Sequence, residues 1–278
     1  MTILVTGHLG FVGSSLFAAM ALLNEYPVGI DEEYFFKENW NEELIKILEE
    51  ISPSVVFHVG ACSDTLETDV NYMMKRNYES TKTIADYCDK NNIPLIYSSS
   101  AANYGSDGAY PSNLYGWSKY AAEDYVISKN GVALRYFNVY GPGEHKKGRM
   151  SSLAYQAFMK HTKGESVALF PQRPRRDFVY IEDIISANIY AWNNYKKVKG
   201  SYYEVGSGTP RTFEDMLDNL KIPFTYTEHT QIPKGYQFYT CSKEEKWLPG
   251  WAPQFTLETG LSSYRTFLKT MKETRQLC

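Results

Sequence analysis

A tyrosine and a lysine stand four residues apart in the segment YGWSK (115–119), and a serine run, SSS (98–100), precedes them. On a helix, residues at i and i+4 share a face, so Tyr115 and Lys119 project to the same side. A nearby ammonium stabilises tyrosinate and lowers the tyrosine pKa, which makes the phenol a usable general base near neutral pH. Ser100, at a strand end, can hydrogen-bond the reacting hydroxyl. On its own, the pattern is also typical of an ordinary helix face, so its sequence context must decide whether these residues are catalytic.

That context is a glycine turn at the start of the chain. VTGHLGFVG (5–13) places Gly7, Gly10 and Gly13 after a strand-like run and at the opening of a helix-like one. Glycines allow a tight turn and close backbone approach, so that the N–H groups of the helix N-terminus can hold a pyrophosphate. Asp31 ends the next strand-like run, where a carboxylate can accept from the ribose hydroxyls of adenosine. Together with Tyr115, these residues predict a dinucleotide site beside an acid–base site.

The elements that must position these residues alternate between strand and helix patterns, which predicts an α/β fold with a Rossmann-like, doubly wound parallel sheet. A short segment, EEYFFKENW (32–40), separates Asp31 from the next helix, so we expect the third strand of a full sheet to be abbreviated or missing and the adenine pocket to be open. The expected strands cover 2–6, 26–30, 54–61, 93–100, 131–137 and 201–206, and the expected helices 11–24, 41–51, 69–91, 115–129, 178–194 and 212–220.

Two domains are expected from this pattern. Residues 1–140, joined by 177–207, form the dinucleotide-binding domain, and 141–278 form a smaller, interleaved nucleotide-sugar-binding domain. The formal net charge is −3 in 278 residues, so neither nucleic acid nor an anionic membrane is expected as a partner. The apolar runs are short and no basic leader precedes the first strand, so neither a transmembrane helix nor a signal peptide is expected.

The cysteines show no disulfide or metal-site spacing, which indicates a reducing cytoplasm. They are Cys62, Cys88, Cys241 and Cys278. No metal site is expected. The protein is expected to form a homo-oligomer.

The motifs resemble the extended short-chain dehydrogenase/reductase family of NAD-dependent epimerases and dehydratases, whose members act on nucleotide-linked sugars. The resemblance covers nearly the whole chain, through the glycine turn, GACS (60–63), SSAANYG (99–105), YGWSK, RYFNVYGP (135–142) and RDFVYIEDI (176–184). It implies catalytic roles for Ser100, Tyr115 and Lys119. It implies cofactor contacts from Gly7, Gly10, Phe11, Val12, Gly13, Asp31, Val59, Gly60, Ala61, Cys62, Ser63, Asn77, Tyr115, Lys119 and Val139. It implies substrate contacts from Asn138, Arg149, Gln156, Phe170, Arg176 and Tyr236.

One branch of the family is most similar, the ADP-glycero-manno-heptose 6-epimerases, through HVGACSDT (58–65), NYMMKRNY (71–78), the segment GPGEHKKGRMSS (141–152) and PKGYQFYT (233–240). The resemblance implies that Lys147 is a second catalytic base, whereas Lys146 is a solvated neighbour. Arg149 and Gln156 replace a serine and a histidine of that branch, and PQRPR (171–175) shortens a substrate loop. The sugar and the nucleotide therefore stay open.

Other readings remain. Ala101 and Ala102 replace the acidic pair of a 4,6-dehydratase, and the cysteine of a fucose-synthase-like enzyme is absent, whereas a UDP-hexose 4-epimerase needs only the serine, tyrosine and lysine. Another nucleotide-sugar oxidoreductase and a catalytically silent Rossmann binding protein are further alternatives.

The choice of cofactor is predicted from the residues after the second strand. Asp31, with Glu32 and Glu33, favours NAD by repelling a 2′-phosphate. NADP stays the alternative, with Lys37 as its contact.

Overall fold

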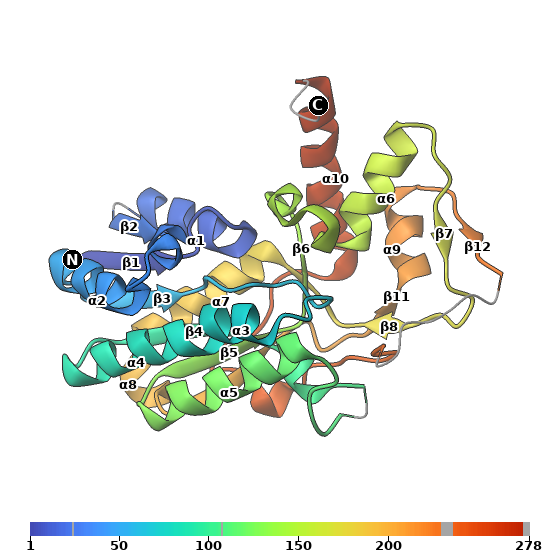
Figure 1. The fold of residues 1–278 in the computed structure, drawn as a ribbon. Coiled ribbons are helices and arrows are strands. Elements are labelled where there is room, and N and C mark those ends of the chain that lie inside the picture. Colours follow the sequence, from blue (N-terminus) through green and yellow to red (C-terminus); the bar gives the residue numbers. More distant parts are fainter. Residues whose placement is uncertain (24, 107, 229–235, 275–278) are drawn as a thin grey trace.

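A six-stranded parallel sheet forms the centre of the protein (Figure 1), with strand order β10-β5-β4-β3-β1-β2. The structure is a computed structural model that describes residues 1–23, 25–106, 108–228 and 236–274. The strand order reverses between the neighbours β1 and β3, and in such sheets ligands bind at the carboxyl ends of the strands beside this point. The strands are β1 (Thr2–Thr6), β2 (Tyr26–Ile30), β3 (Val55–His58), β4 (Leu95–Ser100), β5 (Val132–Tyr136) and β10 (Ser201–Val205).

Helices cover both faces of the sheet, as the apolar, doubly buried strands require. Leu16 and Met20 of α1 and Ile184 of α7 belong to the core on one face. Leu48 of α2 and Ile84 of α4 belong to the core on the other, with residues of α5. These helices are α1 (Phe11–Leu22), α2 (Trp40–Ile51), α4 (Ser80–Lys90), α5 (Leu114–Ser128) and α7 (Ile181–Asn193), with the short α3 (Val70–Met74) and α8 (Tyr195–Val198).

The sheet ends at β2, because a 3-10 helix, Glu33–Phe36, leads directly from that strand toward α2. The expectation of a missing third strand is therefore confirmed in the described part of the chain. The consequence is that the pocket beyond β2 is walled by the 3-10 helix instead of a strand.

A second group of elements stands beyond the carboxyl edge of the sheet, to the right in Figure 1. It comprises α6 (Leu153–Thr162), α9 (Phe213–Leu220) and α10 (Leu257–Glu273), with the strand pairs β7 (Ala168–Leu169) and β12 (Thr225–Tyr226), and β8 (Arg175–Arg176) and β11 (Arg211–Thr212). Between this group and the main sheet, β6 (Asn138–Tyr140) pairs with β9 (Phe178–Tyr180). The two-domain division stays a prediction, which the pairing of β10 with β5 supports.

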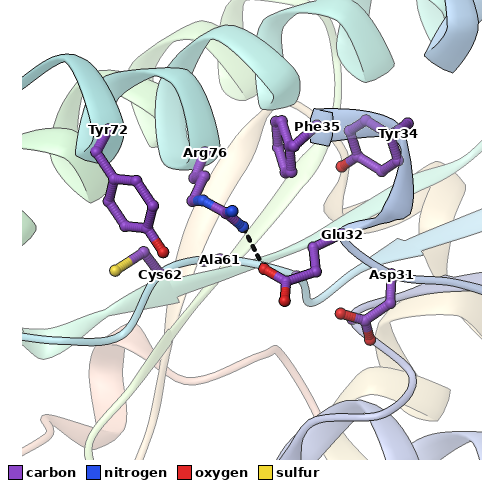
Figure 2. A pocket seen from close by; sticks show the side chains of 10 residues that line it. Asp31, Glu32, Tyr34, Phe35, Ala61, Cys62, Tyr72 and Arg76 are labelled. Carbon is purple, nitrogen blue, oxygen red and sulfur yellow. Dashed lines mark hydrogen bonds and ion pairs between the residues drawn. The ribbon is translucent and has the colours of Figure 1, made fainter. Parts of the chain in front are cut away.

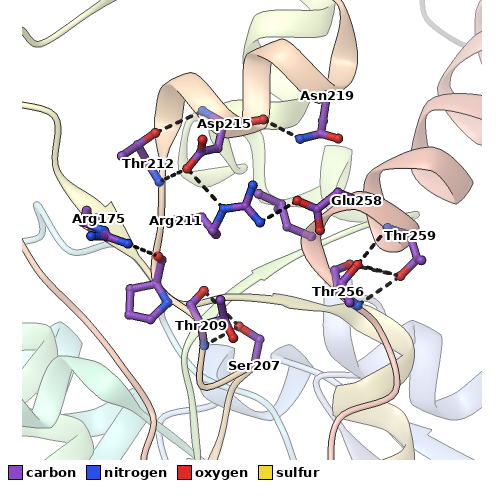
Figure 3. Close-up of polar contacts among 12 residues, drawn as sticks. Arg175, Ser207, Thr209, Arg211, Thr212, Asp215, Asn219, Thr256, Glu258 and Thr259 are labelled. Atoms are coloured by element: carbon purple, nitrogen blue, oxygen red, sulfur yellow. Dashed lines mark hydrogen bonds and ion pairs between the residues drawn. The ribbon is translucent and has the colours of Figure 1, made fainter.

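Local capping fixes the helices of this second group (Figure 3). Thr212 caps α9 through Asp215, and Thr256 caps α10 through Thr259, each as a reciprocal capping box. Arg211 joins the two helix starts, because its guanidinium reaches Asp215 at 3.2 Å and Glu258 at 2.5 Å.

Two expected helices were wrong in detail. The helix expected over 178–194 begins only at Ile181, because Phe178–Tyr180 pair with β6 as a strand. The helix expected over 69–91 contains a π-helical turn at Lys75–Glu79, which often marks a functional site. The helices α6 and α10 were not anticipated.

Candidate functional site

The glycine turn packs closely against the loop after β3. Gly7 has φ +65°, and a Cβ added there would lie 2.5 Å from the Cα of Gly60. A Cβ at Gly13 would lie 2.0 Å from the Gly7 carbonyl oxygen. Both positions therefore require glycine, and the turn leaves the N-terminus of α1, from Phe11 and Val12 onward, facing the carboxyl edge of the sheet. This cradle fits the pyrophosphate of a dinucleotide.

The loop after β3 is held by two buried side chains. The Thr6 hydroxyl accepts from the N–H groups of Val59 (3.1 Å) and Gly60 (3.0 Å). The Asn77 amide accepts from the Cys62 N–H at 2.8 Å and donates to the Cys62 carbonyl at 2.9 Å. The Asn77 amide also donates to the Ser118 hydroxyl at 2.9 Å. These bonds position the loop, and the predicted cofactor contact of Asn77 stays a prediction.

A cavity of about 240 Å³ opens beside this loop (Figure 2). It brings together the predicted cofactor residues Gly7, Asp31, Gly60, Ala61 and Cys62. It also contains Glu32, which was expected to repel a 2′-phosphate. The remaining lining residues were missed from the sequence: Tyr34, Phe35, Tyr72 and Arg76. The one sequence signal for them was the i, i+4 spacing of Tyr72 and Arg76. Lys37, the expected contact of a 2′-phosphate, is exposed and does not line this cavity.

The serine ends β4, and the tyrosine and the lysine lie four residues apart in the first turns of α5. Asn113 caps α5 by accepting from the Gly116 N–H at 2.8 Å, which places Tyr115 in the first turn. The Tyr115 hydroxyl lies close enough to the Ser100 hydroxyl for that group to lower its pKa, and the catalytic roles of both residues stay predictions. The ammonium of Lys119 lies 4.5 Å from the centre of the Tyr97 ring.

Burial controls the charges of this group. Burial raises the pKa of Tyr115, the Ser100 hydrogen bond lowers it, and charge at Cys62 raises it. Burial also lowers the pKa of Lys119 to about 7, against a smaller upward effect of Glu123. The expected lowering of the tyrosine pKa by Lys119 is not met, because this lysine has itself lost much of its charge at neutral pH.

The loop that holds the two lysines is closed from inside by Glu144. This buried carboxylate accepts from the Ser152 N–H at 2.6 Å, the Ser152 hydroxyl at 2.8 Å and the Gly141 N–H at 3.4 Å. Both ends of the 3-10 helix Glu144–Met150 are thereby tied together.

The same helix separates the two lysines. Lys146 is exposed, whereas Lys147 turns inward, with its ammonium 6.0 Å from the centre of the Phe11 ring. Burial lowers the pKa of Lys147, and the charge of Glu144 partly offsets that effect. The lysine thus lies beside the first residue of α1, and its role as a second proton carrier stays a prediction.

A buried guanidinium marks the second half of the site. Arg176 is 5% exposed, and its guanidinium lies 4.9 Å from the centre of the Tyr236 ring. Phe170 packs edge-on against Tyr236, with ring centres 6.0 Å apart. Burial lowers the pKa of Arg176, which means that its charge lacks full compensation inside the protein. Such a cation beside aromatic rings suits an anionic, ring-bearing ligand.

Other predicted substrate residues are engaged within the protein. The exposed Arg149 forms an ion pair with Asp64 of the loop after β3. The amide of Gln156 donates to the Ser151 carbonyl at 2.7 Å. Asn138 is exposed and accepts from the Thr240 hydroxyl at 3.2 Å.

The positions of two predicted cofactor residues do not decide their roles. Val139 is half-buried in β6 and Ser63 is exposed in the loop after β3. In the resemblance segment 233–240, residues 233–235 lie outside the described part of the chain. No group of acidic, histidine and cysteine residues suited to a metal ion occurs among the described residues, and none of their helices is long and apolar enough to cross a membrane.

The comparisons with known proteins agree with this geometry. The family model of the NAD dependent epimerase/dehydratase family matches residues 3–206. The chain belongs to this family. It is 32% identical to the ADP-L-glycero-D-manno-heptose-6-epimerase of Brachyspira hyodysenteriae, over 96% of this chain and 98% of that protein. These findings confirm the predicted family and the prediction of an enzyme, a nucleotide-sugar epimerase.

Solved structures of this epimerase/dehydratase family confirm the Rossmann-like fold. The Helicobacter pylori ADP-L-glycero-D-manno-heptose-6-epimerase matches with a TM-score of 0.84 and 29% identity over 96% of each chain. The UDP-glucose 4-epimerase of Thermotoga maritima matches with a TM-score of 0.83 and 22% identity, over 98% of this chain and 100% of that one, and shows the fold alone. The NAD dependence of the family confirms a nicotinamide cofactor.

Proposed function

We propose that this chain epimerises a nucleotide-diphosphate sugar, most like an ADP-linked heptose, through transient oxidation to a keto-sugar with tightly bound NAD. The observation that supports the proposal is that a buried tyrosine and an inward lysine, from different elements, lie beside the loop after β3 and the start of α1. Tyr115 comes from α5 and lies near Ser100. Lys147 comes from the Glu144–Met150 helix and lies beside Phe11. A UDP-hexose 4-epimerase needs no second carrier.

The chemistry of inversion explains why two carriers are useful. The two epimers direct their hydroxyls differently, so one fixed phenol cannot readily serve both. Tyr115, whose pKa burial raises, holds its proton at neutral pH and donates it in one direction. Lys147, whose pKa burial lowers, accepts the proton of the other hydroxyl. Bound nicotinamide supplies uptake and return of the hydride.

The cofactor and substrate are held by different parts of the site. The cavity beside Asp31 and the Gly7–Gly60 contact fit the adenosine and pyrophosphate of NAD. We propose that Arg176 binds the substrate diphosphate with its planar fork and that Phe170 and Tyr236 pack against the nucleotide base, which the contacts among these three side chains support. Such anchoring would leave the sugar toward Tyr115 and Lys147.

We further propose that the enzyme is a homo-oligomer of the cytoplasm that binds no nucleic acid. The net charge of −3 supports the last point. Cys62, Cys88 and Cys241 are free thiols in the structure, which supports a reducing compartment. Light scattering of the purified protein tests the oligomer.

The deciding experiment is an NMR screen of ADP-, GDP-, UDP- and dTDP-sugars with the purified enzyme and no added reductant. A new epimer from an ADP-linked heptose, absent with Tyr115→Phe, is the expected result. Inversion at C4 of a UDP-hexose, with Lys147→Met fully active, would instead establish the 4-epimerase reading. Bound cofactor with no turnover on any sugar would restore the silent binding protein.

A further inference from the structure

An ion pair closes one side of the cavity beside β2. The guanidinium of Arg76 lies 2.5 Å from a carboxylate oxygen of Glu32, across the space between the 3-10 helix and the π-helical turn (Figure 2). Both residues line the cavity with Asp31. Among its described lining residues, Arg76 is the sole cation. A charge pair thus stands where the proposed NAD site holds adenosine.

Arg76 is held rigidly in this place. Its guanidinium lies 4.8 Å from the centre of the Phe35 ring and 4.5 Å from that of Tyr72. Its side chain is 14% exposed, whereas that of Glu32 is 54% exposed. The backbone is fixed as well, because the next residue, Asn77, is anchored to Cys62. Glu32 is therefore the partner that can leave, and Arg76 is the one that stays.

The carboxylate of Asp31 lines the same cavity beside Glu32 and is fixed by the glycine turn (Figure 2). Its Oδ2 accepts from the Leu9 N–H of the glycine turn at 2.9 Å. A carboxylate at this place accepts from ribose hydroxyls and repels a 2′-phosphate. An NADP molecule would therefore bring its extra phosphate to two carboxylates, Asp31 and Glu32, and to an arginine already neutralised by Glu32.

We infer that the Glu32–Arg76 pair sets the choice between the two nicotinamide cofactors, an inference that rests on the proposed NAD site. Glu32 occupies the guanidinium that would otherwise bind a 2′-phosphate, and so keeps the enzyme selective for NAD. Removing the Glu32 charge frees a rigid, preoriented guanidinium, which binds phosphate in a bidentate manner. Selectivity then shifts toward NADP without any new cation.

The test is calorimetry on the full chain, freed of nucleotide, with NAD, NADP and the half-ligands 5′-AMP and adenosine 2′,5′-bisphosphate. The variants are Glu32→Gln, Arg76→Met and the double variant. The control is Glu38→Gln, which removes an exposed carboxylate that does not line the cavity. Circular dichroism and the thermal midpoint verify folding, which the exposed Glu32 position does not threaten.

The quantity compared is the ratio of NADP to NAD affinity. We expect Glu32→Gln to raise it roughly 10- to 100-fold, the value of a charged hydrogen bond gained by the phosphate. The same rise is expected for the bisphosphate over 5′-AMP. The double variant should lose the rise, and Glu38→Gln should not show it.

Three results would overturn the inference. An equal rise in the double variant would assign selectivity to carboxylate repulsion, without Arg76. An unchanged ratio in Glu32→Gln, with NAD still bound, would leave Asp31 as the determinant. It would refute the role of the Glu32–Arg76 pair but not the proposed NAD site. Failure of the wild-type chain to bind NAD or 5′-AMP would refute the proposed cofactor site itself.

Discussion

Lys119→Met is expected to stabilise the protein while it removes activity. Lys119 is 3% exposed in the wild type, and burial lowers the pKa of its ammonium to about 7 instead of 10.5. Folding must therefore either strip this lysine of its proton or bury its charge. Methionine is similar in shape and carries no charge, so the variant avoids this step. It also loses the contact of the ammonium with the Tyr97 ring, a smaller effect.

The two pKa values give the size and sign of the effect. Between pH 7 and 10.5 the unfolded chain binds more protons at this lysine than the folded chain does, so the lysine destabilises most at low pH and less as pH rises. Linkage yields a destabilisation of about 4 kcal/mol at pH 7 and about 2 kcal/mol at pH 9. The advantage of Lys119→Met should therefore shrink by about 2 kcal/mol over this interval.

Urea unfolding at pH 7, 8 and 9 measures this, on nucleotide-free wild type and variant. Subtracting the two free energies at each pH cancels the titration of the tyrosines, which both proteins share. The control is Lys37→Met at an exposed lysine, for which a flat difference near zero is expected. A flat difference for Lys119→Met as well, or a lysine that titrates near its ordinary pKa by NMR, would refute the reasoning.

Three further predictions concern the chemistry and the core. Tyr115→Phe should lower turnover about 100- to 10,000-fold while cofactor affinity stays nearly intact, because one proton carrier is lost; near-normal turnover contradicts the assignment. Lys147→Met should abolish epimerisation yet still reduce bound cofactor in a single turnover, with Lys146→Met as the near-normal control; normal epimerisation by the first rejects two carriers. Arg135→Met should destabilise by about 3–5 kcal/mol in urea unfolding, because it leaves Glu123, its buried partner at 2.5 Å, unpaired; a loss below about 1 kcal/mol opposes this.

The sequence alone determined the framework and the local chemistry. The glycine turn was readable because Gly7 and Gly13 must lie next to backbone, where no side chain fits. Tyr115 and Lys119 were readable because the helix period places residues four apart on one face. The strand–helix alternation indicated the parallel sheet, and the short segment before α2 indicated its missing strand. These features depend on neighbours within a few residues or on one repeated pattern.

Only the tertiary structure determined which distant segments come into contact and how burial changes their charges. Glu32 and Arg76 are 44 residues apart, and they meet because the parallel strands β2 and β3 deliver both segments to the same edge of the sheet. Glu144 reads as a surface acid in a loop, yet it is buried and closes that loop. The pKa of Lys119 depends on its burial against Tyr97 of a neighbouring strand. Burial and long-range contacts set these charges, and local spacing carries no information about either.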